Sequence, residues 1–321
     1  MTSRLAGHRL EISASKLDII GDVHGCAVTL ERLLERLGYS RKGGVFQHPE
    51  RKVIFVGDII DRGPRIRHAL GLVRDMVDAG NAILVLGNHE LHALFYCLPN
   101  PRVPSNYLRP RTPRNAHIIE DTLEQFANYS GDWLDHLRWL KQRPLYFEVP
   151  GLRVVHACWD ADVIARRCAV IAEDDWAQLA DPASSLSRDI KRLTSGVELP
   201  LPSPHIMTTA EGFKRHSFRA SFWHKNPRVL GDIAFQPDPL PTEVAQLPID
   251  EAIRRELVMY ADDQPLLFVG HYWLNGAPRP ITSNIACLDY SAVKFGRLVA
   301  YRCEGEAQIH PNHFNWVYVD P

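Results

Sequence analysis

Residues 55–63 read Phe-Val-Gly-Asp-Ile-Ile-Asp-Arg-Gly, an apolar run that ends through a glycine in two aspartates and an arginine. A short apolar run bounded by glycine predicts a buried β-strand, with Asp58 at its tip. The same pattern occurs as Ile-Ile-Gly-Asp-Val-His-Gly at 19–25, Val-Leu-Gly-Asn-His-Glu at 85–90 and Phe-Val-Gly-His at 268–271, and without the glycine as Val-Val-His-Ala at 154–157. Strand ends on one edge of a sheet converge, so these side chains are expected to form one cluster. Carboxylates, an amide and imidazoles together are typical of a binuclear metal site, which indicates metal-assisted hydrolysis.

The segments between the first three motifs alternate between strand and helix patterns. Apolar runs predict strands at 16–20, 53–56 and 82–86, and leucines at helical spacing before Gly38 predict a helix, as does the pattern at 65–79. This order predicts parallel strands joined by right-handed crossovers.

The second half of the chain is less regular. We expect helices near 117–129 and 131–141, then a hairpin of strands 145–149 and 152–155. Strand character returns at 266–269, 285–288 and 298–301, which we assign to a second sheet packed on the first. The first and last motifs lie about 250 residues apart and must build one site. We therefore expect a single domain over 1–321, with an insertion or cap at about 160–264 that shapes substrate choice.

Composition excludes several classes of protein. Hydrophobic residues make up 45% of the chain and charged residues 23%, as in a soluble globular protein. A net charge of −1 argues against bulk binding of nucleic acid. No stretch approaches the roughly 20 apolar residues of a membrane span, and the N-terminal sequence lacks the apolar core of a signal peptide. The six cysteines show no metal-binding spacing, so we expect buried free thiols, no membrane association and a cytoplasmic protein.

The ordered motifs resemble those of a known family. The chain is similar to the calcineurin-like metallophosphoesterases in Asp22-x-His24-Gly25, Gly57-Asp58-x-x-Asp61-Arg62-Gly63, Gly87-Asn88-His89-Glu90, His156 and Gly270-His271. Within that family it resembles the phosphoprotein phosphatase branch, which includes bacterial serine/threonine phosphatases and symmetrical diadenosine tetraphosphate hydrolases. The resemblance implies an α/β fold of four layers, α/β/β/α, with two mixed β-sheets flanked by helices and an irregular insertion.

The resemblance also implies two divalent metal ions and their ligands. It assigns Asp22, His24 and Asp58 to one ion, and Asp58, Asn88, His156 and His271 to the other. Mixed imidazole and oxygen ligands favour Mn, with Fe, Zn, Ni, Co or Mg as alternatives.

Three further residues have roles that the resemblance implies. His89 would protonate the leaving oxygen, and Asp61 would orient its ring. Arg62 would hold two phosphate oxygens with its guanidinium fork. Glu90 is expected to be structural rather than a metal ligand.

The sequence departs from the family pattern in two places. Many members carry two glycines after the fourth-motif histidine, whereas His156 is followed by Ala157 and Cys158. The family's second phosphate-binding arginine lies in a motif that is not found here. We choose Arg219, within the strand-like alternation of residues 216–223, over the other candidates Arg188, Arg192, Arg215 and Arg228.

An arginine-rich segment at 99–115 allows two interpretations. It contains Arg102, Arg109, Arg111 and Arg114 and no acidic residue. It is either a solvated loop or an active-site flap whose charge attracts a phosphorylated substrate.

Three functions remain open from the sequence. The first is a metal-dependent phosphoesterase that hydrolyses phosphate monoesters, including phosphoserine, phosphothreonine or phosphotyrosine of proteins, by attack of a hydroxide that bridges the metals. The second is symmetrical hydrolysis of diadenosine tetraphosphate, which His92 slightly favours because it resembles a residue of those enzymes. The third is a non-catalytic metal-binding scaffold. The expected partner is thus a phosphoprotein or a nucleotide.

Overall fold

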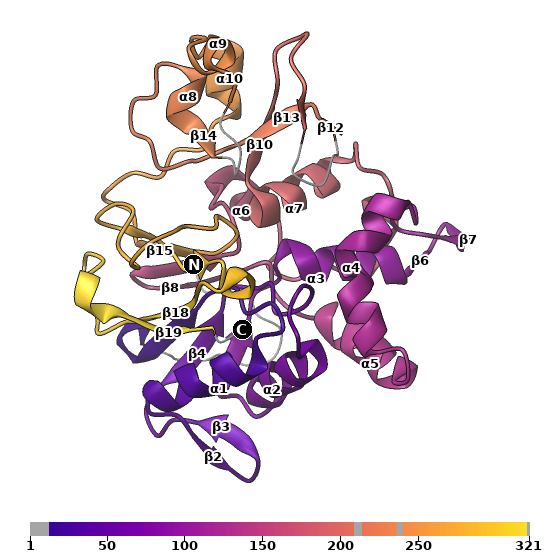
Figure 1. Ribbon diagram of the computed structural model, residues 1–321, viewed down its shortest axis with the longest axis vertical. Helices are drawn as coiled ribbons and strands as arrows, with labels where there is room; N and C mark the ends of the chain where they lie inside the picture. Colours follow the sequence, from indigo (N-terminus) through magenta and orange to yellow (C-terminus); the bar gives the residue numbers. More distant parts are fainter. Residues whose placement is uncertain (1–12, 209–213, 236–239, 320–321) are drawn as a thin grey trace.

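The strand that leads to Asp22 lies at the centre of the larger of the two main β-sheets. Strands β4, β18 and β19 of this sheet are seen in Figure 1. The computed structural model describes residues 13–208, 214–235 and 240–319. The larger sheet has the order β17-β18-β1-β4-β5, and β19 also pairs with β18. Its strands are β1 (Leu17–Ile20), β4 (Lys52–Phe55), β5 (Ala82–Leu84), β17 (Asp289–Tyr290), β18 (Arg297–Arg302) and β19 (Phe314–Tyr318). As predicted, β1, β4 and β5 are parallel to one another.

The second sheet carries the two later histidine motifs. Its order is β16-β15-β9-β8, with β8 (Tyr146–Val149), β9 (Leu152–Val155), β15 (Leu266–Val269) and β16 (Ile285–Cys287). The predicted hairpin is confirmed, because β8 and β9 are antiparallel. Strands β9, β15 and β16 are parallel, so His156 and His271 follow the same edge of this sheet.

The two sheets pack on each other through one hydrophobic cluster. Leu17, Ile19 and Ile54 of the larger sheet share this cluster with Val154 and Phe268 of the smaller one. Because successive side chains of a strand point to opposite faces, the neighbouring residues of the same strands turn away from this interface.

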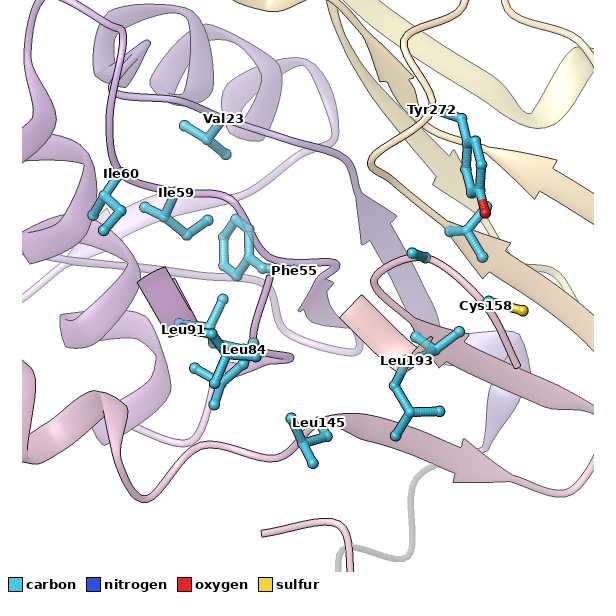
Figure 2. Close-up of a cluster of buried hydrophobic side chains, with 14 of the residues drawn as sticks. Val23, Phe55, Ile59, Ile60, Leu84, Leu91, Leu145, Cys158, Leu193 and Tyr272 are labelled. Carbon is cyan, nitrogen blue, oxygen red and sulfur yellow. The ribbon is translucent and has the colours of Figure 1, made fainter. Parts of the chain in front are cut away.

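The outward face of the larger sheet is covered by the two predicted helices, α1 (Ala27–Arg36) and α2 (Ile66–Asp78). Ile20 and Phe55 pack there with Leu33 of α1 and Val73 of α2. The same cluster continues to the second sheet, as Figure 2 shows from Phe55 and Ile59 to Cys158, Leu193 and Tyr272. These layers form the α/β sandwich that the resemblance implies.

One strand assignment is wrong. Residues 298–301 do not join the second sheet, since β18 pairs antiparallel with β1 at the centre of the first. The prediction failed because strand character in the sequence does not say which partner a strand will find.

Helices and small hairpins lie beside the sheets. The helices predicted near 117–129 and 131–141 are α4 (Pro113–Gln125) and α5 (Ser130–Leu140), and α3 (Asn88–Cys97) precedes them. The arginine-rich segment is more ordered than either interpretation assumed, because it begins with the hairpin of β6 (Pro99–Asn100) and β7 (Val103–Tyr107). Another hairpin joins β2 (Ser40–Lys42) to β3 (Val45–Gln47).

Residues 160–264 form short elements outside the two sheets, many of them at the top of Figure 1. The helices here are α6 (Ala161–Arg166), α7 (Ser185–Ser195), α8 (Leu230–Ile233), α9 (Thr242–Ala245) and α10 (Glu251–Glu256). The strands are β10 (Val197–Pro200), β11 (Met207–Thr208), β12 (Lys214–Arg215), β13 (Ser217–Ala220) and β14 (Ala234–Phe235), with β13 between β10 and β14.

Two sequence expectations concern the chain as a whole. All six cysteines are free, and four of them are buried, whereas Cys168 is exposed. Within the described ranges, the helices are too short or too polar to span a membrane.

Candidate metal centre

The candidate ligands come from strand ends of both sheets. Asp22 follows β1, Asp58 follows β4 and Asn88 opens α3 after β5, while His156 follows β9 and His271 follows β15. The structure brings His24, Asp58 and His89 into one group of ligand atoms, and Asp58, His156 and His271 into another. Within each group these atoms lie within 4.8 Å of one another. Two groups that share one carboxylate are the arrangement that a bridged pair of metal ions requires.

Asp58 faces the imidazoles from both sides. Its Oδ2 lies 3.3 Å from Nε2 of His156 and 3.7 Å from Nε2 of His24. Its Oδ1 accepts a hydrogen bond from the backbone N–H of His89 at 3.0 Å. Oδ2 is therefore the oxygen that is directed into the cluster.

Backbone carbonyls fix two of the histidine rings. Nδ1 of His24 donates to the carbonyl of Ile60 and Nδ1 of His156 to that of Val56, each at 2.8 Å. Each Nε2 is then directed toward Asp58, and in the neutral ring it carries the lone pair that could bind a metal ion. Nε2 of His156 also lies 3.1 Å from Oδ1 of Asn88. Two electron-pair donors that converge in this way are suited to a shared cation.

Asp22 provides an independent test of this fit. Its Oδ2 accepts from the backbone N–H of His271 at 3.1 Å, whereas its Oδ1 is buried and has no hydrogen-bond partner among the described residues. Burial raises the pKa of Asp22 well above its usual range, and the nearby carboxylate of Asp289 raises it further. Buried carboxylates so close together need a compensating positive charge, which a metal ion would supply.

Burial acts in the opposite direction on the imidazoles. It lowers the pKa of His24 to about 3 and that of His271 well below its usual range. Neutral imidazole is the form that binds metals. For His156, burial is outweighed by the attraction of Asp58, which raises its pKa to about 10. His156 is thus the ring most strongly tied to the shared carboxylate.

The glycine that precedes His271 allows the two sheets to approach. A Cβ at Gly270 would lie 2.0 Å from Oδ1 of Asp22, so the Asp22 carboxylate could not keep its present position. Gly270 therefore belongs to the architecture of the site.

The proposed acid pair is also in place. Nδ1 of His89 lies 2.6 Å from Oδ2 of Asp61, and both side chains are buried. Burial raises the pKa of Asp61 to about 7 and lowers that of His89 to about 4. Both shifts disfavour charge, so burial favours a pair that is neutral overall, with one proton shared between the Asp61 carboxylate and the His89 ring. A general acid needs such a proton to donate.

Glu90 is structural, as expected. Its carboxylate accepts hydrogen bonds from the backbone N–H groups of Asp58, Ile59 and Gly87 at 2.8, 2.8 and 3.0 Å. It therefore holds the loop that presents Asp58.

The two arginines differ in their surroundings. Arg62 is exposed, and its charge acts on His24 and His89. Arg219 is half-buried on β13, and its Nη1 donates to the carbonyl of His271 at 3.3 Å. Arg192 is instead paired with Asp160 and Glu256. Arg219 thus contacts a candidate metal ligand, His271, through the backbone carbonyl of that residue.

Two arginines of the segment 99–115, which were considered for phosphate attraction, have partners within the protein. Nη1 of Arg109 donates to Nδ1 of His92 at 2.5 Å, and Nε2 of His92 donates to the carbonyl of Asn115 at 2.8 Å. Nε of Arg111 donates to the carbonyl of Tyr96 on α3 at 3.4 Å. At least two of the four arginines therefore attach the segment to the protein, and His92 is part of that attachment.

Sequence reasoning missed three residues near this site. Asp289 ends the apolar run 285–288, so the pattern that revealed Asp22 could have revealed it. Thr122 and Gln125 lie on α4 and contact the loop that contains Asp61. Nothing in their local sequence separates them from other polar helix residues.

The chain is similar in sequence to known proteins. The family model of the calcineurin-like phosphoesterases matches residues 15–180, just over half of the chain. An asymmetrical bis(5'-nucleosyl)-tetraphosphatase from Oceanobacillus iheyensis is 33% identical over 148 residues, which are 44% of this chain and 55% of that protein. A symmetrical bis(5'-nucleosyl)-tetraphosphatase from Thioalkalivibrio sulfidiphilus is 32% identical over 158 residues, 47% of this chain and 48% of the relative. The chain thus spans about half the length of these curated relatives.

Among solved structures, the cold-active protein-tyrosine phosphatase of a Shewanella species is 16% identical and has a TM-score of 0.47. The alignment covers 95% of this chain and 80% of that one. The family match includes five of the six candidate ligands, and the structure brings the sixth, His271, to the same cluster. The chain therefore belongs to the calcineurin-like phosphoesterase family.

Proposed function

We propose that this protein is a metal-dependent hydrolase of phosphate monoesters. The observation that carries the proposal is that His89, which is hydrogen-bonded to Asp61, lies among the side chains that surround Asp58. A site that only stored metal would not need an oriented imidazole with a proton to donate. The non-catalytic scaffold is therefore disfavoured.

The residues that would hold two divalent ions are Asp22, His24 and Asp58 for one, and Asp58, Asn88, His156 and His271 for the other. Such a pair polarises a phosphoryl oxygen and supplies a hydroxide nucleophile near neutral pH. Mn is our preferred metal for this ligand set, with Fe, Zn, Ni, Co or Mg as alternatives.

The remaining chemistry belongs to the protein. Arg62, which is exposed and whose charge acts on His24 and His89, would bind two phosphate oxygens. Arg219 would add a second positive charge from the side of His271. His89 would donate its proton to the departing oxygen while Asp61 keeps the ring in place. The region 160–264, which contributes Arg219, would act as the cap that limits substrate choice.

A second candidate substrate is a dinucleoside polyphosphate. It is favoured by the curated relatives, which are named as tetraphosphatases of this kind over the part of the chain that they share. Symmetrical and asymmetrical cleavage would both use the same metal ligands and acid.

A substrate panel tests these proposals. The full chain is assayed with p-nitrophenyl phosphate, phosphoserine and phosphotyrosine peptides and diadenosine tetraphosphate, each with Mn²⁺, Mg²⁺, Ni²⁺ or Zn²⁺. Turnover of the monoesters supports the first proposal. Preference for diadenosine tetraphosphate supports the second, and the products distinguish two ADP from ATP plus AMP. If no substrate is turned over with any metal, the proposed hydrolase function is refuted, and the non-catalytic metal-binding scaffold is favoured.

A further inference from the structure

The loop between Asp58 and α2 has an unusual backbone. Asp61 and Arg62 are both left-handed, with φ values of 65° and 67°. Residues other than glycine seldom adopt this conformation, because the Cβ approaches the backbone too closely. Two consecutive residues of this kind persist only where surrounding contacts hold them. The contacts that hold this loop therefore determine where the Asp61 carboxylate and the Arg62 guanidinium lie.

Helix α4 supplies contacts at both ends of the loop. At one end, Oγ1 of Thr122 accepts from the backbone N–H of Asp61 at 3.1 Å and donates to Oδ1 of the same residue. At the other end, Gln125 accepts from the N–H of Ile66 at 2.6 Å and donates to the carbonyl of Gly63 at 3.0 Å. The two side chains lie on the same face of α4, three positions apart.

The Thr122 hydroxyl completes a chain of hydrogen bonds that ends at His89. One carboxylate oxygen of Asp61 is bound by Thr122, and the other lies 2.6 Å from Nδ1 of His89. Thr122 is fully buried, so water cannot replace its hydroxyl without a rearrangement. Without the hydroxyl, the N–H of Asp61 would lose its acceptor and the carboxylate would be free to rotate away from the ring.

We propose that Thr122 is a positioning residue for proton donation, acting through Asp61 on His89. This inference rests on the proposed function, since it assigns Thr122 to the hydrolysis of a phosphate ester. Gln125 holds the same loop without contacting the Asp61 carboxylate, and therefore serves as a comparison for a purely structural role.

The experiment measures kcat and KM for a series of aryl phosphates, from p-nitrophenyl phosphate to phenyl phosphate, with the Mn²⁺-loaded full chain. Thr122→Val keeps the shape of the side chain and removes the hydroxyl. Loss of a supporting contact of this kind typically costs about 10–100-fold in activity. We expect that loss in kcat for phenyl phosphate, whose leaving oxygen needs a proton. A smaller loss is expected for p-nitrophenyl phosphate, so that the dependence of rate on leaving-group pKa becomes steeper.

Two further variants separate positioning from loop stability. Thr122→Ser retains the hydroxyl and should restore the wild-type dependence on the leaving group. Gln125→Leu should alter all substrates by the same factor, because it loosens the loop without releasing the carboxylate. If Thr122→Val does not fold, Thr122→Ala makes the same comparison with a smaller side chain.

The outcomes distinguish this inference from the proposed function. Equal loss on every substrate for Thr122→Val, or the same steepening for Gln125→Leu, would overturn the positioning role. The proposed hydrolase activity would still stand in that case, provided that His89→Asn makes the dependence of rate on leaving-group pKa steeper. Wild-type protein without turnover would instead refute the proposed function itself.

Discussion

Asp58 is the residue on which both halves of the candidate metal centre depend. Its Oδ2 faces His24 on one side and His156 on the other. Asp58→Asn removes the negative charge but keeps an oxygen that can accept from the N–H of His89. We expect fewer than two ions per chain and loss of nearly all activity, as measured by elemental analysis and by phosphatase assay. Asp22→Asn should weaken mainly one ion, and two tightly held ions in Asp58→Asn would exclude a bridging role.

Gly270 is a second residue on which the candidate metal centre depends. A Cβ at Gly270 would meet Oδ1 of Asp22 at 2.0 Å, so Gly270→Ala should push that carboxylate out of the cluster and lower metal content. Gly71 is the matched control, since a Cβ on this α2 residue would meet nothing within 4 Å. Gly71→Ala should stabilise the protein by roughly 0.5–1 kcal/mol, because alanine favours helix. Full metal content in Gly270→Ala would mean that Asp22 can move without consequence.

At the scale of an element, the hairpin of β6 and β7 is attached to α3 through Arg109. The guanidinium donates to His92 and lies over the ring of Phe95. Backbone bonds from Leu108 to Leu98 and from Arg109 to Phe95 then close the segment. This attachment explains why an arginine-rich stretch without acids is ordered here.

Arg109→Gln should therefore loosen the hairpin. A hydrogen bond that involves a charged group contributes about 1.5–3 kcal/mol, so amide exchange in residues 98–109 should accelerate by roughly 10-fold or more. Arg102→Gln is the control, since Arg102 lies on the same hairpin and is exposed. Exchange is followed by mass spectrometry at constant pH. Equal rates in both variants would show that the Arg109–His92 contact does not hold the segment.

At the scale of the whole molecule, Asp18 joins parts of the chain that are far apart in sequence. This fully buried carboxylate of β1 accepts from Arg51 at 3.2 Å, from Arg302 at 2.9 Å and from the hydroxyl of Tyr39 at 2.9 Å. Removing one partner of a buried ion pair leaves the other charges uncompensated, which typically costs about 3–5 kcal/mol.

Asp18→Ala should lower the free energy of unfolding by about that amount in guanidinium titrations. Asp262→Ala breaks an exposed pair with Lys225 and should cost at most about 1 kcal/mol. A similar, small effect of both substitutions would mean that the Asp18 network adds nothing beyond a surface contact.

Short sequence patterns predicted most of the strands and helices and the clustering of the candidate ligands. They did not predict contacts between residues that are far apart in the sequence. The clustering of the candidate ligands was predictable because they follow apolar runs, and a glycine directly precedes Asp22, Asp58, Asn88 and His271. The position of β18 was not, since its neighbour β1 lies almost 300 residues away. Thr122 was missed for the same reason, because its partner Asp61 is 61 positions earlier.

The candidate ligands are far apart along the chain, so they are synthesised at different times. During synthesis on a ribosome, Asp22 through His156 emerge long before His271, whose backbone N–H also holds Asp22 in place. A nascent chain that ends before β15 can therefore present most of the ligands but not the complete centre. The second sheet is also unfinished at that stage, because β15 lies between β9 and β16. Translation of β15 and β16 would then be the step that completes the candidate metal centre.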